Sequence, residues 1–385
     1  MESGASFEFA TAARLIVGAG RAAELPPIVA GIGSRAIVYT GAHPARHEHL
    51  LAGLGVPYSV FAVGGEPTLD DARAAVRAAG EQGADVVVAV GGGSVIDLAK
   101  AAAMIVANGG DPLDYLELIG HGRGITRPSV PLVAVPTTAG TGAEVTANAV
   151  LSSPEHRIKA SLRSPLMIPR VALVDPLLTL GCPPSVTASS GLDALTQCLE
   201  PFVSVRANPL TDALAREGLR RAATGLRRAY ADGTDVDARG DMSLCSVLGG
   251  MALANAKLGA VHGFAGVIGA TVDIPHGMAC AALLAPVVAA NTRALRARQP
   301  DSPALARYEE AARILTGRPD ASVTDGVGWL RETQTMLGVG GLGAYGLRPE
   351  HADDIVAKAA KASSMQGNPI VLEPDELHAA LDAAM

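Results

Sequence analysis

The chain has 385 residues, which is enough for two domains that each bury a core of their own. Its formal net charge is −7 and no stretch concentrates basic residues, which argues against nucleic acid as a partner. Hydrophobic residues make up 49% of the chain and aromatic residues only 3%, so we expect a core of Ala, Val and Leu in an α/β protein with many helices.

Strand and helix patterns alternate through the first half of the sequence. Apolar runs predict strands at residues 35–41, 84–94, 130–138 and 171–175, and helical spacing predicts helices at 68–83 and 95–110. Thr68 is the expected N-cap of the first of these helices. Repeated β-α-β units imply a parallel sheet with right-handed crossovers, whose ligands bind at the carboxyl ends of the strands.

The sequence changes character at LGCPPSVTASS (180–190), where Pro183 and Pro184 interrupt any helix. Beyond this point nearly every segment has a helical period. We therefore predict an α/β plus all-α protein, with a Rossmann-like parallel-sheet domain over residues 1–182 and an all-helical domain over residues 183–385.

Three features bear on the location of the protein. The most apolar long segment, roughly residues 244–272, contains Asn255, Lys257 and His262 and is predicted to be a buried helix rather than a membrane span. The N-terminal sequence MESGASFEFATAARLIVG lacks the features of a signal peptide. The four cysteines have no C-x-x-C spacing and fit reduced, buried thiols of a cytoplasmic protein: Cys182, Cys198, Cys245 and Cys280.

Two glycine-rich loops follow buried strands. In GGGS (91–94) the glycines let the backbone approach a phosphate at a helix N-terminus, although the same letters also make a plain tight turn. The loop is not the G-x-G-x-x-G fingerprint. PTTAGTGAEVT (136–146) places four hydroxyl residues around glycines, which suits a pyrophosphate, a ribose or an amide, or alternatively a polar cap. Two such loops at one sheet edge favour a nucleotide cleft.

The stretch GLDALTQCLE (191–200) resembles half of a metal site. Asp193 and Gln197 are four residues apart, so on a helix both side chains face a common point. An imidazole is the expected second ligand, and Gln197 offers only a neutral amide oxygen, a poorer donor to late first-row metals.

Six motifs in this order resemble the iron-containing (group III) alcohol dehydrogenase family: GGGSVIDLAK, PTTAGTGAEVT, GLDALTQCLE, NPLTD, IPHGMACAALL and SSMQGNP. The resemblance spans nearly the whole chain. It implies a Rossmann-like domain that binds NAD(H) or NADP(H), a helical domain that binds a divalent metal and the substrate, and a homodimer. The implied reaction is reversible hydride transfer between an alcohol and a carbonyl compound.

The resemblance also assigns cofactor residues by position. It implies contacts with the pyrophosphate from Gly92, Gly93 and Ser94, with the nicotinamide end from Asp97, with the cleft from Thr137, Thr138 and Thr141, and with ribose and adenine from Lys159, Thr179 and Leu180. Gly41 stands where NAD-preferring members often carry an Asp, and Arg46 is nearby. Without that carboxylate NADP(H) is permitted and favoured, and the alternative is a plain turn glycine with NAD(H) as cofactor.

Asp193, His262 and His276 match three of the four family ligands for Fe or Zn, and Gln197 stands at the fourth. Three strong ligands and a water still suffice for a catalytic zinc site. Asp193 and His262 are therefore the expected catalytic residues. Gly266 replaces a histidine that the family often uses as a proton relay one turn after His262.

Other functions stay open at this stage. A metal-independent reductase of the maleylacetate reductase type would use His262 and Gln197 as hydrogen-bond donors to the substrate oxygen. A lyase of the dehydroquinate synthase type needs basic residues for a substrate phosphate, and none adjoins Asp193 or His262. A binding protein without turnover is the fourth reading. The apolar surroundings expected near Phe264 and Gln366 favour a neutral alcohol or aldehyde as the small-molecule substrate.

Overall fold

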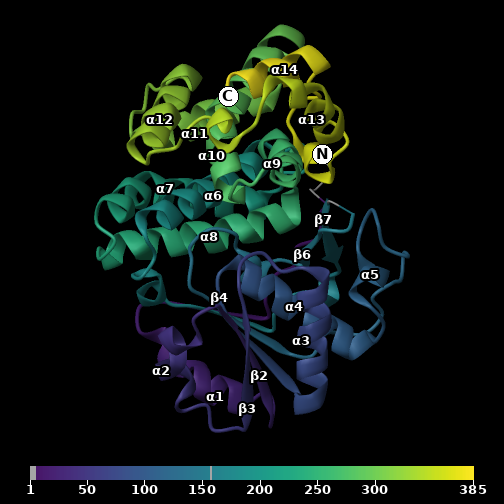
Figure 1. Cartoon of the computed structure of the whole chain (residues 1–385). Helices are drawn as coiled ribbons and strands as arrows, with labels where there is room; N and C mark the ends of the chain where they lie inside the picture. The colour runs from purple at the N-terminus through teal and green to yellow at the C-terminus, as the bar shows by residue number, and fades with distance from the viewer. Residues whose placement is uncertain (1–5, 157) are drawn as a thin grey trace. The chain divides into compact units, whose positions relative to one another are not determined.

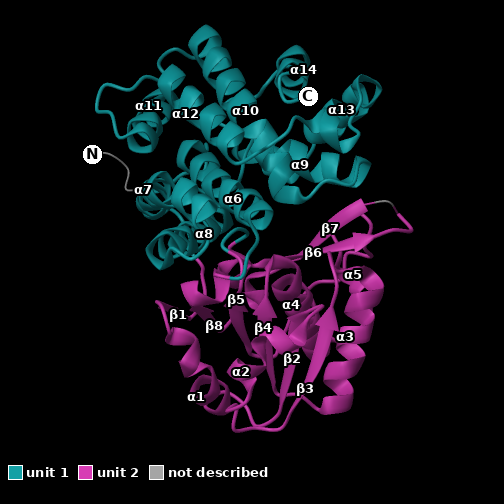
Figure 2. Cartoon of the chain, turned by 60° about the vertical axis from the view of Figure 1, so that its left-hand side comes forward, with its two compact units in different colours: residues 1–9, 139–141, 181–385 teal, residues 10–138, 142–180 magenta. Residues whose placement is uncertain are grey.

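The computed structural model describes residues 6–156 and 158–385 (Figure 1). The chain forms two compact units (Figure 2), a sheet unit of residues 10–138 and 142–180 and a helical unit of residues 1–9, 139–141 and 181–385. The first five residues, where the expectation of no signal peptide begins, lie outside the described part.

Six parallel strands make the main sheet, in the order β1-β8-β5-β4-β2-β3. Their bounds are β1 Arg14–Val17, β2 Ala36–Gly41, β3 Tyr58–Val63, β4 Val86–Gly91, β5 Leu132–Pro136 and β8 Val171–Val174. The predicted parallel sheet is thereby confirmed. The edge strands β1 and β3 were not predicted, because an edge strand is half exposed and lacks a continuous apolar run.

Helices cover both faces of this sheet. Side chains alternate along β2, so that Val38 packs with α1 (Leu25–Ala30) and α2 (Glu48–Leu51), whereas Ile37 packs with α3 (Leu69–Gln82) and α4 (Gly93–Asn108). The short helix α5 (Pro112–Tyr115) lies beyond α4 in the chain. Thr68 caps α3 as predicted, because its side chain accepts a hydrogen bond from the backbone N–H of Asp71.

The chain direction reverses between β2 and β4. From β2 the chain runs outward to β3, and from β4 it runs the other way to β5. Helices that follow the two strands lie on opposite faces, so their carboxyl ends diverge into a crevice. Gly41 ends β2 and Gly91 ends β4, which puts both glycines at this edge.

A two-stranded antiparallel hairpin, β6 (Asn148–Ser153) and β7 (Ile158–Arg163), follows the second glycine-rich loop. It was not predicted from the sequence. Its N–H of Val150 donates to Asp97 Oδ2 of α4 at 3.0 Å, so the hairpin is tied to the helix that carries the first glycine loop.

The helical unit contains nine described α-helices, as predicted for the second half. They are α6 Pro184–Val203, α7 Pro209–Ala231, α8 Val236–Ala256, α9 Ala260–Thr271, α10 His276–Arg298, α11 Pro303–Thr316, α12 Val323–Met336, α13 Ala352–Ala359 and α14 Pro374–Asp382. Pro183 and Pro184 start α6, as N-cap and first helical residue, because a missing N–H costs nothing at a helix start.

The prediction of one buried helix over roughly residues 244–272 was wrong in one respect. The chain breaks at residues 257–259 into α8 and α9, which bend by 99°. Lys257 adopts a positive φ of 67° at the break. By length and composition α10, or the bent pair α8–α9, could cross a bilayer, but 83% of the apolar window of α10 is buried inside the protein.

Small residues let the helices approach closely, as the low aromatic content predicts. A Cβ on Gly218 of α7 would lie 2.3 Å from Cys198 Sγ of α6.

Trp329 is the only tryptophan in the sequence, and it is buried on α12 with the guanidinium of Arg227 4.6 Å above its ring centroid.

Candidate active site

Asp193 and Gln197 lie in the middle of α6, one turn apart, and both are buried. The Gln197 amide nitrogen donates to Asp193 Oδ2 at 3.0 Å. Because α6 begins at Pro184, Asp193 is in the third turn of the helix and not at its positive end. The carboxylate is therefore held by its neighbours rather than by the helix dipole, which acts only within the first turn.

His262 is the third residue of α9, and two buried side chains fix the start of that helix. Asn368 Oδ1 accepts from the N–H of Ala260 at 3.1 Å, and Glu200 Oε1 accepts from the N–H of Val261 at 2.7 Å. Gly259 is needed here, since its Cβ would lie 2.9 Å from Glu200 Oε1. The break before α9 thus delivers His262 into the interior of the unit.

His276 and Cys280 share one face of α10, one turn apart. His276 is the first residue of the helix, and Cys280 is buried, with Sγ 3.6 Å from His276 Nε2. The next residue after His276, Gly277, packs against α6, because its Cβ would lie 2.3 Å from the backbone oxygen of Ser189. This contact sets the position of the first turn of α10.

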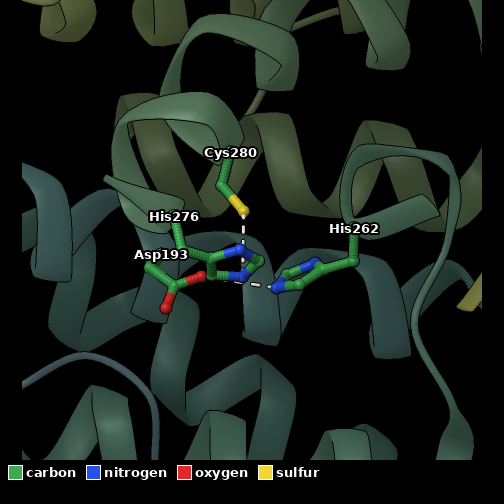
Figure 3. A group of neighbouring side chains, drawn as sticks. All are labelled: Asp193, His262, His276 and Cys280. Atoms are coloured by element: carbon green, nitrogen blue, oxygen red, sulfur yellow. Dashed lines mark hydrogen bonds and ion pairs between the residues drawn. The ribbon is translucent and has the colours of Figure 1, made fainter. Parts of the chain in front are cut away.

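Four side chains from these three helices converge (Figure 3). One donor atom from each of Asp193, His262, His276 and Cys280 lies within 4.8 Å of the others. His262 Nε2 and Asp193 Oδ1 are 3.3 Å apart, yet neither has a hydrogen-bond partner in the described structure, and Gln197 Oε1 is likewise buried without one. Buried polar atoms are normally satisfied, so these donors fit a divalent cation.

The charges within this cluster balance one another. Burial opposes ionisation of Asp193, but the close approach of His262 and the charges of both imidazoles outweigh it, so its pKa is lowered. Burial likewise opposes ionisation of Cys280, and the two imidazoles lower its pKa nonetheless. The charge that Cys280 carries when it ionises raises the pKa of His276 to about 9. The carboxylate and the thiol therefore favour protonated rings, and a cation bound among these groups would compete with the ring protons.

The structure places the predicted donors Asp193, His262 and His276 together and adds Cys280, which the sequence analysis took for a plain core thiol. The four-residue spacing of His276 and Cys280 on a helical pattern is the signal that could have found it. Phe264, expected near the substrate, is instead fully buried in the apolar core.

Gly266 follows His262 by one turn on α9. It is exposed, and no atom lies within 4 Å of the position its Cβ would take. A side chain could therefore stand there without displacing a neighbour.

The two glycine-rich loops meet at the crevice of the sheet unit. Gly92 is the N-cap of α4, so Gly93 and Ser94 form the first turn of the helix, where backbone N–H groups suit a phosphate. A Cβ on Gly92 would lie 3.2 Å from Thr138 Oγ1, and the N–H of Thr137 donates to Gly91 O at 3.0 Å. The residues predicted to bind the pyrophosphate, Gly92 to Ser94, therefore lie next to the predicted cleft residues Thr137 and Thr138.

A buried lysine that the sequence analysis missed joins the same two loops. Lys100 of α4 is fully buried, and its Nζ donates to Ala143 O at 2.9 Å and to Thr146 Oγ1 at 3.0 Å. Its charge is paired with Asp97 Oδ1 at 3.0 Å. Asp97 is thus a structural tie as well as a candidate cofactor residue. The spacing D-x-x-K was the available signal.

The remaining predicted cofactor residues are more dispersed. Gly41 is half-buried with open space around its Cβ position, and Arg46 is exposed in the 3-10 turn after it. Lys159 Nζ pairs with Glu66 Oε2 at 2.6 Å. Thr179 is buried, with its hydroxyl donating to Pro176 O, and Leu180 follows half-buried. Thr141 is exposed and is grouped by its contacts with the helical unit.

Comparison with known proteins gives the same picture for the whole chain. The family model described as "Iron-containing alcohol dehydrogenase" matches residues 12–176, and that described as "Fe-containing alcohol dehydrogenase family, C-terminal" matches residues 187–385. The chain belongs to the iron-containing alcohol dehydrogenase family, and the resemblance inferred from the motifs is confirmed.

Individual relatives agree. Alcohol dehydrogenase 4 of Saccharomyces cerevisiae is 40% identical over 233 residues, which are 60% of this chain and 60% of that protein. The solved 1,3-propanediol oxidoreductase has a TM-score of 0.91 at 29% identity, covering 99% of this chain and 100% of that one. Sulfoacetaldehyde reductase from Bifidobacterium kashiwanohense, solved with NAD+, has a TM-score of 0.88 at 28% identity, with 99% of each chain covered.

Proposed function

We propose that this protein is an NAD(P)-dependent oxidoreductase that interconverts an alcohol and an aldehyde or ketone, with a divalent metal, Fe or Zn, assisting hydride transfer. The observation that carries the proposal is the convergence of Asp193, His262 and His276, with donor atoms of Asp193 and His262 buried without a hydrogen-bond partner, in a member of this family. The relatives named as alcohol dehydrogenases and as a propanediol oxidoreductase support it, and they do not favour the metal-independent alternative.

Asp193, His262 and His276 would hold the metal, with Gln197 beside them. When bound, the ion supplies Lewis acidity toward the substrate oxygen. Glu200 accepts a hydrogen bond from His262 Nδ1 at 2.7 Å, which leaves Nε2 of that ring as the lone-pair donor. Asp193 is fixed in turn by the amide of Gln197. The chain's own part in the reaction is therefore to hold one rigid, water-poor set of donors.

The sheet unit would hold the cofactor. The pyrophosphate would bind at the first turn of α4, which is formed by Gly92, Gly93 and Ser94. Thr137 and Thr138 lie beside this turn. Asp97, Thr141, Lys159, Thr179 and Leu180 remain candidates for further contacts with the dinucleotide. The NAD+ found with the sulfoacetaldehyde reductase supports a nicotinamide cofactor, and Gly41 favours NADP(H).

We further propose a cytoplasmic homodimer, and a neutral alcohol or aldehyde as substrate. Cys198, Cys245 and Cys280 are free thiols, which supports a reducing compartment. Family membership supports the dimer.

The test is elemental analysis of protein purified without chelator, combined with NADH and NADPH oxidation across an aldehyde panel. We expect about one equivalent of metal, because the cluster forms one site, and turnover that chelator removes and metal restores. Turnover that persists without metal would indicate a metal-independent reductase, in which His262 donates a hydrogen bond to the substrate oxygen. Neither metal nor turnover would leave a nucleotide-binding protein.

A further inference from the structure

We propose that Cys280 is the fourth metal ligand, in the place that the family resemblance gives to an imidazole and the sequence gives to Gln197. The ligand set is then Asp193, His262, His276 and Cys280, and the resident metal is zinc rather than iron. This inference rests on the proposed metal-assisted function.

The position of the thiol supports its role as a ligand. Cys280 Sγ is one of four donor atoms that lie within 4.8 Å of one another, and it follows His276 by one turn of α10. Cys280 is buried with its sulfur beside the His276 ring, whereas a plain core thiol would contact aliphatic groups. Figure 3 shows the sulfur directed at the His276 ring, toward the other donors.

Gln197 already has a different task. Its amide nitrogen donates to Asp193 Oδ2, so the side chain orients the carboxylate that would bind the metal. A ligand carboxylate commonly carries such an outer partner. The amide oxygen remains buried without a partner and is free to accept from a water or a substrate hydroxyl. The thiol of Cys280 therefore replaces the metal ligand that is lost because residue 197 is Gln and not His.

The donor chemistry sets the metal preference. A thiolate is a soft ligand that favours zinc, whereas a site of carboxylate and imidazoles alone also suits ferrous iron. One carboxylate, two imidazoles and one thiolate would supply four ligands of the kinds that zinc takes in proteins.

Two measurements on full-length protein test the proposal. The protein is stripped and loaded with cobalt(II) alone, and the near-ultraviolet absorption is searched for the charge-transfer band that a thiolate ligand gives. In parallel, X-ray absorption on the zinc-loaded wild type determines whether one sulfur scatterer lies at about 2.3 Å. We expect both signals, with one metal per chain.

Cysteine variants determine which thiol supplies the sulfur ligand of the metal. Cys280→Ser should lose the cobalt band and weaken zinc binding by more than the roughly 10–100-fold that loss of an outer partner causes. Cys182→Ser removes a half-buried thiol outside the cluster and should keep the band, as should Gln197→Ala. If Cys280→Ser fails to fold, the wild-type absorption spectrum alone decides.

The outcomes separate the two proposals. One equivalent of metal with only nitrogen and oxygen neighbours, or loss of the band in Gln197→Ala but not in Cys280→Ser, overturns the role of Cys280 and leaves the metal-assisted function intact. A chain that takes up no metal and still turns over overturns the metal-assisted function and this inference with it.

Discussion

Glu200 Oε2 lies 2.7 Å from His262 Nδ1, in a buried hydrogen bond beside the cluster. The second oxygen of Glu200 accepts from the N–H of Val261, so a single carboxylate of α6 fixes both the ring and the backbone that carries it. This is the carboxylate–histidine arrangement that orients ligands in metal sites.

Glu200→Gln should therefore weaken zinc binding by roughly 10–100-fold, because the amide holds the His262 tautomer less firmly. Competitive zinc titration against a chromophoric chelator measures the affinity. Glu217→Gln, a partly exposed glutamate of α7 that pairs with Arg221, is the control and should leave the affinity unchanged. Equal affinities in the two variants would rule out an orienting role for Glu200.

Gly277→Ala should displace the first turn of α10. The added Cβ would lie 2.3 Å from the backbone oxygen of Ser189, which cannot rotate away. We expect a loss of roughly 1–3 kcal/mol in the free energy of unfolding of the helical unit and weaker metal binding through His276. Gly328→Ala on α12, where nothing lies within 4 Å of the Cβ position, is the matched control and should not destabilise. Denaturant titration gives the free energies.

Gly266 offers a test of the missing relay. Gly266→Ala should stabilise α9 by about 0.5–1 kcal/mol, since the position is exposed, helical and open. Gly266→His places an imidazole on the face that carries His262. If proton transfer limits turnover, kcat should rise in the His variant relative to the Ala variant, measured at equal metal content. Identical kcat values would show that this position has no part in the relay.

Gly41→Asp should shift cofactor preference toward NADH. The position ends β2 at the crevice, and its surroundings are open, so an Asp side chain fits. A carboxylate there accepts from the ribose 2′-hydroxyl and repels a 2′-phosphate. The ratio of kcat/KM for NADPH to that for NADH should fall by roughly tenfold or more. Gly41→Asn, which lacks the charge, should change the ratio less.

Glu144 should make the sheet unit less stable as pH rises. It is fully buried in the 3-10 turn Ala143–Val145, and burial raises its pKa from the usual 4.5 to about 7, against the opposing charge of Lys100. The unfolded chain releases this proton first, so the stability that the neutral carboxyl contributes is complete below pH 4.5 and is lost as pH rises through about 7.

The full loss is on the order of 3 kcal/mol. Glu144→Gln should flatten the profile between about pH 5 and about pH 8, measured by urea unfolding followed by circular dichroism. A wild-type profile as flat as that of the variant would contradict the assignment to Glu144.

The fold was largely predictable because its signals are local. Buried strands such as 84–94 are continuous apolar runs, and Thr68 with Asp71 marks a helix start in four residues. The edge strands and the β6–β7 hairpin escaped prediction, because half-exposed strands are specified by their partners rather than by their own sequence. The break before α9 depends on Asn368, which is more than a hundred residues away in the sequence. A local sequence pattern therefore does not predict the break.

The candidate site was predictable only as far as a family motif reaches. Asp193, His262 and His276 stand at ligand positions of the family motifs. Cys280 lies within the motif IPHGMACAALL, but the resemblance gives it no role, so only the convergence of three helices shows it beside the other donors. Lys100 was missed for a related reason. A lysine in an apolar helix breaks the apolar pattern of the sequence, and its buried role is evident only when its hydrogen-bond acceptors in the following loop are known.

The position of Trp329 determines what an optical experiment on this protein reports. As the only tryptophan, buried on α12 under Arg227, it confines the long-wavelength emission to the helical unit, which carries the metal donors. The sheet unit contributes only tyrosines, Tyr39, Tyr58 and Tyr115. A melt followed by tryptophan fluorescence would therefore report unfolding of the helical unit and not that of the sheet unit.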